Sequence, residues 1–323
     1  MVSVNNTRIT AAEGVGLGLR IPHLSYILQH RPAINWFEVP VCNFLRAPFN
    51  RDLLHQISAH YPLSFHGVSL NLGGSDQLNQ EYLSALKRAV DEFQPALVSE
   101  HACFTAHQGQ HFHDLLPVPY TQQGVKHFVD RLDQVQNVLG RKILIENVSR
   151  YCAYPESEMS EAEFLAAICH HSGCGLVLDL NNIYVNQMNF PKDTHLSLEH
   201  FIRHIPLDSI GELHLAGHSR QGEYLVDTHG SEICDPVWDL YSDFLKYWRS
   251  NSTKQHRTKT APPCLIEWDN NLPTFSVLQQ QGEKAQLLME STLNRSTPVE
   301  NNRFRNDRIK DNHQDNAARE LLL

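Results

Sequence analysis

Residues 143–180 read ILIENVSRYCAYPESEMSEAEFLAAICHHSGCGLVLDL, and this stretch carries the signals that decide the fold. Two short runs rich in Val, Ile and Leu, at 143–147 and 176–180, are typical of strands buried on both faces of a sheet. Between them, Ser160 and Glu163 have the spacing of a capping box ahead of an apolar helical pattern. A strand, a helix and a second buried strand in this order indicate an α/β fold with parallel strands.

The same alternation of strand and helix extends along most of the chain. Further helical patterns begin near Thr121 and at Pro236, and another covers about 79–93. The predicted strands are 15–20, 34–39, 63–70, 97–101, 143–147, 176–180, 210–215 and 264–268. Eight is the number of strand–helix units in a (β/α)8 TIM barrel, so we predict a single α/β barrel domain.

A doubly wound open sheet is the alternative architecture, and the glycines of the first strand argue against it. That fold would need a glycine-rich phosphate turn after its first strand, but Gly14, Gly16 and Gly18 alternate within the strand. Alternating glycines there indicate close packing inside a barrel. We assign the barrel domain to residues 14–293, with an N-terminal extension at 1–13 and a polar C-terminal tail at 294–323.

Composition excludes several classes of function. Hydrophobic residues make up 41% of the 323 residues, and the formal net charge of −9 argues against a nucleic-acid-binding surface. The polar start lacks the apolar core of a signal peptide, and no apolar stretch approaches membrane-spanning length. The seven cysteines are scattered without a CxxC pair, which indicates reduced thiols. We therefore expect a cytoplasmic protein that binds neither nucleic acid nor membrane.

Acids and histidines close most of the predicted strands. Burying such a group without a partner costs several kcal/mol, so the repetition calls for a common explanation. In a parallel barrel the C-terminal ends of all strands meet at one mouth. We therefore predict a metal site at that mouth. The strand-end residues are His66, His101, Glu146, Asp179, His214 and Glu267.

Charge balance at the mouth favours more than one metal ion. The carboxylates expected to meet there are Glu146, Asp179, Asp227 and Glu267. Like charges at close range force protonation or destabilise the fold, and neutral histidines do not cancel them. Several multivalent cations would cancel them, with one carboxylate bridging.

Spacing within the motifs adds further candidates. Asp227 and His229 are two residues apart in VDTHG, so in an extended segment they point the same way and could bind one ion together. In DLNN, Asn182 can supply a carbonyl oxygen as a weaker ligand. In IEWD, Asp269 shares a face with Glu267, which makes Asp269 a candidate base beside a metal-bound Glu267.

Other histidines near the strand ends carry less weight. His218 falls beyond its strand and is a weaker candidate, and we interpret His111 and His113 as surface residues of a loop that contains Gln and Gly. The loops at 105–119 and 184–194 are long enough to form a docking surface at the mouth.

Eight ordered motifs between about Gly14 and Leu293 resemble those of a known family, the multinuclear non-haem iron-dependent oxidative enzymes. The B subunit of methanobactin biosynthesis typifies this family, which was long catalogued as a domain of unknown function. The motifs are HGVSLNLGG, SEHACF, DLLPVPYT, ILIENVSRY, LVLDLNNIYVN, ELHLAGH, DTHG and IEWDNNLP.

The resemblance implies a TIM barrel that holds two or three iron ions at its C-terminal mouth. Family members use molecular oxygen to modify cysteine or other residues of a ribosomally made precursor peptide, and usually act with a small partner protein that delivers it. In this chain the implied iron ligands are His66, His101, Glu146 as a bridge, Asp179, Asn182, His214, Asp227, His229 and Glu267. Asp269 is our candidate for moving a proton in the reaction.

Two other functions remain open at this point. Barrels of the xylose isomerase and endonuclease type also gather His, Asp and Glu around divalent metals, and they isomerise sugars or hydrolyse phosphodiesters. The donor types permit iron, manganese or zinc, although the acidic net charge counts against a DNA substrate. A metal-storing or peptide-binding module without turnover is the remaining alternative.

Overall fold

Eight parallel strands form the closed barrel that the sequence predicts. The computed structural model describes residues 11–45, 48–254 and 260–294. The strands follow the order β1-β12-β9-β8-β7-β4-β3-β2 around the barrel, and every neighbouring pair is parallel. The bounds are β1 Val15–Gly18, β2 Phe37–Pro40, β3 Leu63–His66, β4 Leu97–His101, β7 Leu144–Glu146, β8 Gly175–Asp179, β9 Ile210–Ala216 and β12 Cys264–Glu267. All eight predicted strands are present, and an open doubly wound sheet is excluded.

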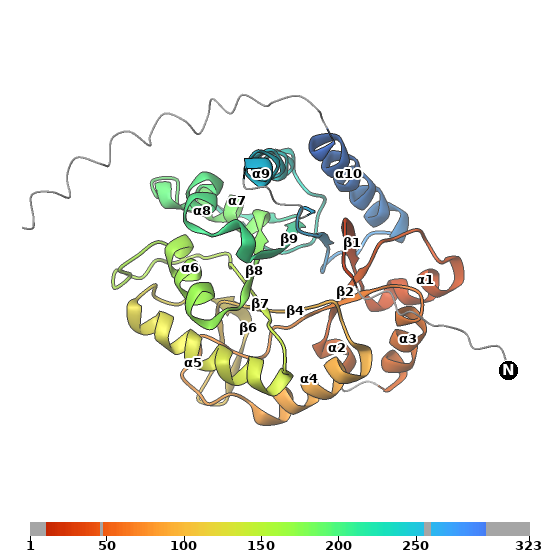
Figure 1. Ribbon diagram of the computed structural model, residues 1–323, viewed down its shortest axis with the longest axis horizontal. Coiled ribbons are helices and arrows are strands. Elements are labelled where there is room, and N and C mark those ends of the chain that lie inside the picture. The colour runs from red at the N-terminus through yellow and green to blue at the C-terminus, as the bar shows by residue number, and fades with distance from the viewer. Residues whose placement is uncertain (1–10, 46–47, 255–259, 295–323) are drawn as a thin grey trace, which may run out of the picture.

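Helices surround the barrel and bury its outer face (Figure 1). The α-helices are α1 Leu24–His30, α2 Cys42–Leu45, α3 Pro48–Ser58, α4 Gln80–Phe93, α5 Gln122–Leu139, α6 Glu161–Ser172, α7 Leu180–Asn189, α8 Leu198–His204, α9 Asp235–Lys254 and α10 Phe275–Leu293. Short 3-10 turns lie at η1 Ile21–His23, η2 Thr194–Leu196 and η3 Leu207–Ser209. No helix among the described residues combines the length and apolar character needed to cross a membrane.

The predicted helix starts are set by their capping residues. The Thr121 side chain accepts a hydrogen bond from the backbone N–H of Gly124 at the start of α5. At the start of α6, Ser160 and Glu163 form the complete capping box, which satisfies two of the free N–H groups of that helix end. These local signals place each helix start close to the position read from the sequence.

The glycines of β1 allow bulky side chains inside the barrel. A Cβ atom added to Gly16 would lie 2.3 Å from the Trp36 ring, and one added to Gly18 would lie 2.9 Å from the Arg20 guanidinium. No real side chain tolerates the first approach, so Gly16 is needed for Trp36 to be fully buried there. This confirms close packing as the reason for the alternating glycines.

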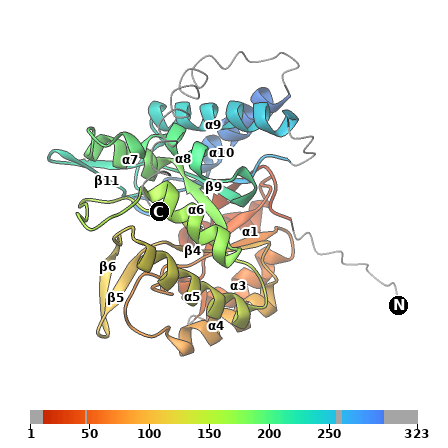
Figure 2. The ribbon, with the colours of Figure 1, turned by 60° about the vertical axis from the view of Figure 1, so that its left-hand side comes forward.

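Two hairpins beside the mouth were not predicted. The segment at 105–119, expected to be a loop, contains most of the antiparallel pair β5 Phe104–His107 and β6 Gln110–Leu116. The segment at 184–194 was also expected to be a loop, but α7 continues to Asn189 because its residues contact β9 and the second hairpin. That hairpin is β10 Ser219–Gln221 with β11 Tyr224–Val226, and β5, β6 and β11 project on one side of the barrel (Figure 2).

The expected terminal segments lie almost entirely outside the described residues. Of the N-terminal extension at 1–13, only residues 11–13 are described, and of the C-terminal tail at 294–323, only residue 294. The domain limits drawn from the sequence therefore stay predictions.

Candidate metal centre

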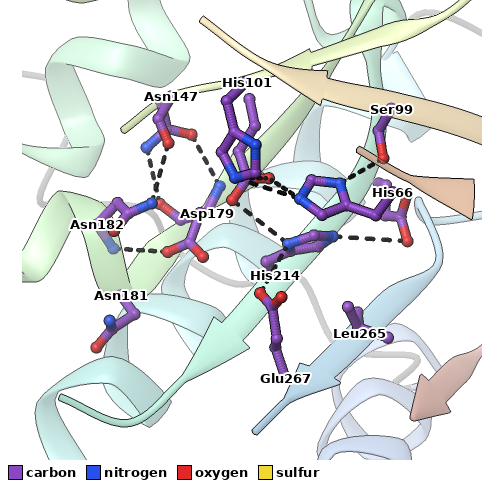
Figure 3. A network of polar contacts seen from close by, with 12 residues as sticks. His66, Ser99, His101, Asn147, Asp179, Asn181, Asn182, His214, Leu265 and Glu267 are labelled. Atoms are coloured by element: carbon purple, nitrogen blue, oxygen red, sulfur yellow. Dashed lines mark hydrogen bonds and ion pairs between the residues drawn. The ribbon is translucent and has the colours of Figure 1, made fainter. Parts of the chain in front are cut away.

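The C-terminal ends of six barrel strands bring buried acids and histidines together, as the sequence predicts. Each of the six side chains belongs to a residue that is at most 7% exposed. His66, His101 and His214 converge on one another, with Asp179 and Glu267 on the flanks (Figure 3). The six residues are His66 of β3, His101 of β4, Glu146 of β7, Asp179 of β8, His214 of β9 and Glu267 of β12.

His66, His101 and Glu146 form the first group of possible metal donors. The Nε2 atoms of the two histidines are 3.2 Å apart. Glu146 Oε2 lies 3.3 Å from His66 Nε2 and 3.5 Å from His101 Nε2. These separations are long for charge-assisted hydrogen bonds, which are about 2.7–2.9 Å. Donors that share an ion at about 2.0–2.2 Å from each would lie roughly this far apart.

The tautomers of these two histidines follow from their other ring nitrogens. His101 Nδ1 lies 3.0 Å from the carbonyl oxygen of Gly67, which can only accept, so the neutral ring carries its proton there. His66 Nδ1 lies 2.7 Å from the hydroxyl of Ser99, and that hydroxyl is directed at a carbonyl of β3 3.4 Å away. In their neutral forms both rings would present an Nε2 lone pair to Glu146. Two lone pairs and a carboxylate repel one another, so this group needs a positive charge, either a bound metal ion or a proton on one of the rings.

Glu146, Asp179, His214 and Glu267 form the second group, and their donor atoms lie within 4.8 Å of one another. His214 Nδ1 is 3.4 Å from Glu146 Oε1 and 3.3 Å from Glu267 Oε2. Because the other oxygen of Glu146 faces His66 and His101, its two oxygens point into different groups. This arrangement suits a carboxylate that bridges two ions.

Asn147, directly after β7, positions the junction between β8 and α7, where Asp179 ends the strand and Asn182 lies in the first turn of the helix. Its side chain accepts from the Asp179 backbone N–H at 2.8 Å and donates to the Asp179 carbonyl at 3.0 Å. The Asn182 side-chain amide donates to the Asn147 carbonyl at 3.0 Å, which leaves Asn182 Oδ1 buried without a hydrogen-bond partner among the described residues. Asn182 thus offers the carbonyl oxygen expected of it.

Asp227 and His229 lie after the second hairpin and reach the same centre from outside the barrel. His229 Nε2 is 2.7 Å from Asp227 Oδ1, so the two side chains pair directly. His229 Nδ1 lies 3.4 Å from Glu267 Oε2 and 3.1 Å from Asp269 Oδ2. His229, Glu267 and Asp269 form a third group of donor atoms within 4.8 Å. The structure thus brings together all nine predicted ligands, while their binding of metal stays a prediction.

Asp269 has a partner that sequence reasoning missed. Arg20, directly after β1, donates through Nε to Asp269 Oδ1 at 2.7 Å, and its Nη2 also contacts Asp269 and lies 3.5 Å from Glu267. Arg20 is 7% exposed, and the only sequence signal was a charged residue at the end of the first strand. Asp269 retains 36% exposure of its side chain. It can therefore contact both the centre and a substrate.

Glu38 of β2 and Glu212 of β9 were also missed, and both lie inside the barrel. His214 Nε2 is 3.3 Å from Glu38 Oε2 and 3.7 Å from Glu212 Oε1. These donor atoms form another buried group within 4.8 Å. A signal existed for Glu212, because it precedes His214 by two residues and so shares its face of β9.

The remaining histidines occupy different places. His218 Nδ1 is 2.8 Å from Asn181 Oδ1, and Asn181 in turn donates to Asp227 Oδ1 at 2.7 Å, so His218 supports the centre indirectly. His111 and His113 are exposed, as interpreted from the sequence, but they lie on strand β6 instead of in a loop. His113 borders the mouth cavity.

The pKa values of the clustered residues are shifted in opposite directions. Burial lowers the pKa of His66 to about 4. Burial also acts downward on His101, but the carboxylates of Glu146 and Glu100 outweigh it and raise its pKa to about 9. Burial raises the pKa of Asp179 well above its ordinary value. For Glu146, burial is outweighed by His214 and His101, which lower its pKa to about 2. Without a metal ion, the protons that His101 and Asp179 retain thus offset part of the negative charge of the cluster.

Several buried atoms of the centre have no hydrogen-bond partner among the described residues. They include Glu146 Oε2, Asp179 Oδ2, Asn182 Oδ1 and both ring nitrogens of His214. Leaving one such group unsatisfied costs about 1–3 kcal/mol, and more when it is charged. Oxygen and imidazole donors of this kind are the ligands that divalent first-row metals bind. The residues therefore fit a metal centre.

A cavity of about 710 Å³ opens above the centre. It reaches His66, His101, His229 and Glu267, so a bound molecule could contact the predicted metal ligands directly. Phe112 and Val68, both exposed apolar side chains, line its outer part. The cavity thus combines an apolar entrance with a polar floor.

Comparison with known proteins identifies a matching family and several similar proteins. A sequence model of the family "RiPP precursor modification enzyme MbnB/TglH/ChrH" matches residues 14–290. A UPF0276 protein of Acaryochloris marina is 41% identical over 278 residues, which cover 86% of this chain and 95% of that protein. A UPF0276 protein of Psychromonas ingrahamii is 42% identical over 276 residues, covering 84% and 92% respectively.

Solved structures share the architecture at low sequence identity. A D-psicose 3-epimerase has a TM-score of 0.54 at 10% identity, with 87% of this chain and 99% of that one covered. Endonuclease IV from Thermus thermophilus has a TM-score of 0.51 at 14% identity, with the same coverage. At these identities the likeness extends to the barrel fold alone.

Proposed function

The chain belongs to the MbnB/TglH/ChrH family of RiPP precursor modification enzymes, and from this premise we propose that it is an iron-dependent oxidase. Its substrate would be a ribosomally made precursor peptide, modified with molecular oxygen at a cysteine. The observation that carries the proposal is that His66 Nε2, His101 Nε2 and Glu146 Oε2 lie 3.2–3.5 Å from one another inside the barrel, the separations expected of donors that share a metal ion.

Two or three iron ions would be held by donor groups that share residues. The first ion would take His66, His101 and Glu146, and the second would take Glu146, Asp179, His214 and Glu267. A third would take His229 with Asp227, and Asn182 would add its amide oxygen to the cluster. Glu146 would bridge because its two oxygens face two groups. When bound, ferrous iron would supply electrons for the reduction of oxygen and a site for the substrate sulfur.

The protein side chains would fix the geometry around that centre. Ser99 and the Gly67 carbonyl set the tautomers of His66 and His101. Arg20 donates to one oxygen of Asp269, which leaves the other directed at His229 and near the cavity. From this position Asp269 would accept a proton from the substrate and return it, which retains it as our candidate catalytic residue.

The peptide would enter along the edge of strand β6. Four consecutive residues, 112–115, line the cavity. Because side chains alternate between the two faces of a strand, a run of consecutive lining residues means that the strand presents its edge. Strand β5 pairs with β6 on either side of this run, through Ala106 with His111 and Phe104 with Leu116. Between these two pairs, Thr105 is the single β5 residue opposite residues 112–115 of β6. An extended peptide could pair with such an edge.

A small delivery protein would dock on the hairpins that flank the cavity. Phe112 of β6 and Tyr224 of β11 are exposed, large and apolar, as expected for contacts at an interface. Alanine at either position should weaken co-purification with the partner and leave the metal content unchanged. Loss of metal in those variants would mean that the hairpins support the centre instead.

The decisive test compares iron with zinc in protein purified without oxygen. Iron-loaded protein should consume oxygen only with its cognate peptide, should show the electron paramagnetic resonance of a multinuclear iron centre, and should change the mass of the peptide. Equal activity of zinc-loaded protein would overturn the oxidative proposal. It would favour the non-redox chemistry of the divalent-metal isomerases and hydrolases instead.

A further inference from the structure

The carboxylates of Glu38 and Glu212 lie beneath the predicted metal ligands, inside the barrel. Their side chains are 1% and 0% exposed, and neither residue borders the mouth cavity. None of their four oxygens has a hydrogen-bond partner among the described residues. Burying two carboxylates here is energetically costly, because solvent cannot screen them. Since substrate cannot reach them either, their presence calls for a structural or functional explanation.

His214 lies between these two carboxylates and the predicted metal ligands. Its Nδ1 faces Glu146 and Glu267, at 3.4 Å and 3.3 Å. Its Nε2 faces the inner pair, 3.3 Å from Glu38 Oε2 and 3.7 Å from Glu212 Oε1. The other two barrel histidines of the centre differ in their nearest partners: His66 turns Nδ1 to the Ser99 hydroxyl, and His101 turns Nδ1 to the Gly67 carbonyl at 3.0 Å, with Glu100 Oε1 farther away at 3.6 Å.

A neutral imidazole can offer only one nitrogen to a metal, because the other carries the proton. Carboxylates accept hydrogen bonds and donate none once they are ionised, the form that a cation at the neighbouring centre would favour, so Glu38 and Glu212 facing Nε2 would then hold the proton on that nitrogen. The lone pair then lies on Nδ1, on the side of Glu146 and Glu267. The negative charges behind Nε2 also make Nδ1 a stronger donor.

We propose that Glu38 and Glu212 are positioning residues that hold the Nε2–H of His214 and thereby direct its Nδ1 to the metal centre. They act through His214 and do not bind an ion themselves. The inference rests on the proposed metal centre and adds two residues, from β2 and β9, that its ligand set does not contain.

The test measures metal affinity and thermal stability separately. Cobalt(II), whose visible absorbance reports its coordination, is titrated into metal-free full-length wild-type, Glu38→Gln and Glu212→Gln proteins. Both variants should bind about 10–100-fold more weakly, the range for losing a partner of a metal-bound histidine. The number of ions bound at saturation should stay that of the wild type. The absorbance of the ion next to His214 should shift.

Thermal melting of the metal-free proteins excludes a merely structural role. Each glutamine variant keeps the size of the buried side chain and places no charge in the barrel interior, so its metal-free form should melt at the wild-type temperature or above it. Glu161→Gln is the matched control: Glu161 is also buried, at 4% exposure, but it lies at the start of α6 away from His214. This control should keep wild-type affinity for cobalt.

The outcomes separate this inference from the proposed function. Wild-type protein that binds no cobalt would overturn both. Wild-type affinity in Glu38→Gln and Glu212→Gln would overturn the positioning role and leave the metal centre standing. Loss of one ion at saturation would make the inner pair ligands instead of positioning residues, which would also overturn the inference.

Discussion

Two regions of this molecule are rich in histidines and acids, and only one fits a metal centre. The first is the barrel mouth. The second is an outer pocket between α6, α8 and the loop after β7, lined in part by Arg150, Ser160, Glu163, Asp193, His195, His200 and His204. In the outer pocket His200 Nε2 contacts the Ser160 hydroxyl at 2.8 Å, and Asp193 accepts from Arg150 at 2.7 Å. At the mouth, by contrast, Glu146 Oε2, Asp179 Oδ2 and both ring nitrogens of His214 are buried without a hydrogen-bond partner in the part of the chain that the structure describes.

The two regions differ although both contain histidines and acids, so residue type alone does not make a metal site. His200 and His204 have the i, i+4 spacing of a helical metal-binding pair, but their polar atoms are occupied by protein partners or face solvent. The mouth differs because closure of the barrel directs ring nitrogens and carboxylates at one another, away from water. What distinguishes the site is a concentration of buried carboxylates that needs positive charge close by.

The largest expected effect comes from removing the bridging carboxylate. Glu146→Ala should lose more than one iron ion per chain, because the two oxygens of Glu146 face two donor groups. Elemental analysis of protein purified without oxygen measures this, with His200→Ala in the outer pocket as the matched control that keeps all its metal. Full metal content in Glu146→Ala would refute the bridge and weaken the contrast between the two regions.

A smaller effect is expected from the proton carrier at the edge of the mouth. Asp269→Asn should retain iron and bind peptide, but turnover should fall by about 10²–10⁴-fold, the usual contribution of a positioned acid or base. Single-turnover kinetics with wild-type iron content measures it. A wild-type rate would remove Asp269 from the chemistry. Loss of iron would make it a ligand, as its grouping with His229 and Glu267 also allows.

Asn182 should matter less than any charged ligand. Asn182→Ala should lose at most one ion, because an amide oxygen is a weak neutral donor and its neighbour Asp179 remains. The same elemental analysis decides the point. Loss of all iron would show that the start of α7 depends on Asn182 for its position, and the hydrogen bond from Asn182 to the Asn147 carbonyl would then be its main role.

For the outer pocket we predict an effect on the stability of the fold and none on metal binding. Burial raises the pKa of Glu161 to about 7, against the partial compensation of Arg150. Between about pH 4.5 and pH 7 the Glu161 carboxyl therefore keeps its proton in the folded state but releases it in the unfolded state. The free energy of unfolding of the wild type consequently falls as the pH rises through this window. Glu161→Gln has no such proton to lose, and it should be more stable than the wild type at pH 8 by about 3 kcal/mol.

Denaturant unfolding of the metal-free proteins at several pH values checks this difference. The advantage of Glu161→Gln should shrink steadily below about pH 7 and vanish near pH 4. A variant that is less stable at every pH would mean that the ionised carboxylate is needed by Arg150. The outer pocket would then resemble the mouth more closely than we infer.

The fold could be predicted because its signals are local. The strand at 176–180, LVLDL, is short and apolar except for Asp179, and the Ser160 capping box lies within four residues, so neither signal depends on distant parts of the chain. The hairpin at β5 and β6 was missed because its exposed residues carry no apolar alternation. The predicted loop at 184–194 was wrong for the opposite reason: α7 is held by contacts with β9 and β11, which a local pattern does not report.

For the candidate site, the strand ends that carry metal-donor side chains could be read from the sequence, because an acid or histidine at the end of an apolar run is a local feature. Only the tertiary structure decided how they face one another. The Arg20–Asp269 pair joins residues 249 positions apart. Similarly, Glu38 reaches His214 because both strands line the same interior. Closing the barrel places these groups a few ångströms apart and removes water from between them, and the strength of charge interactions depends on that distance and dielectric.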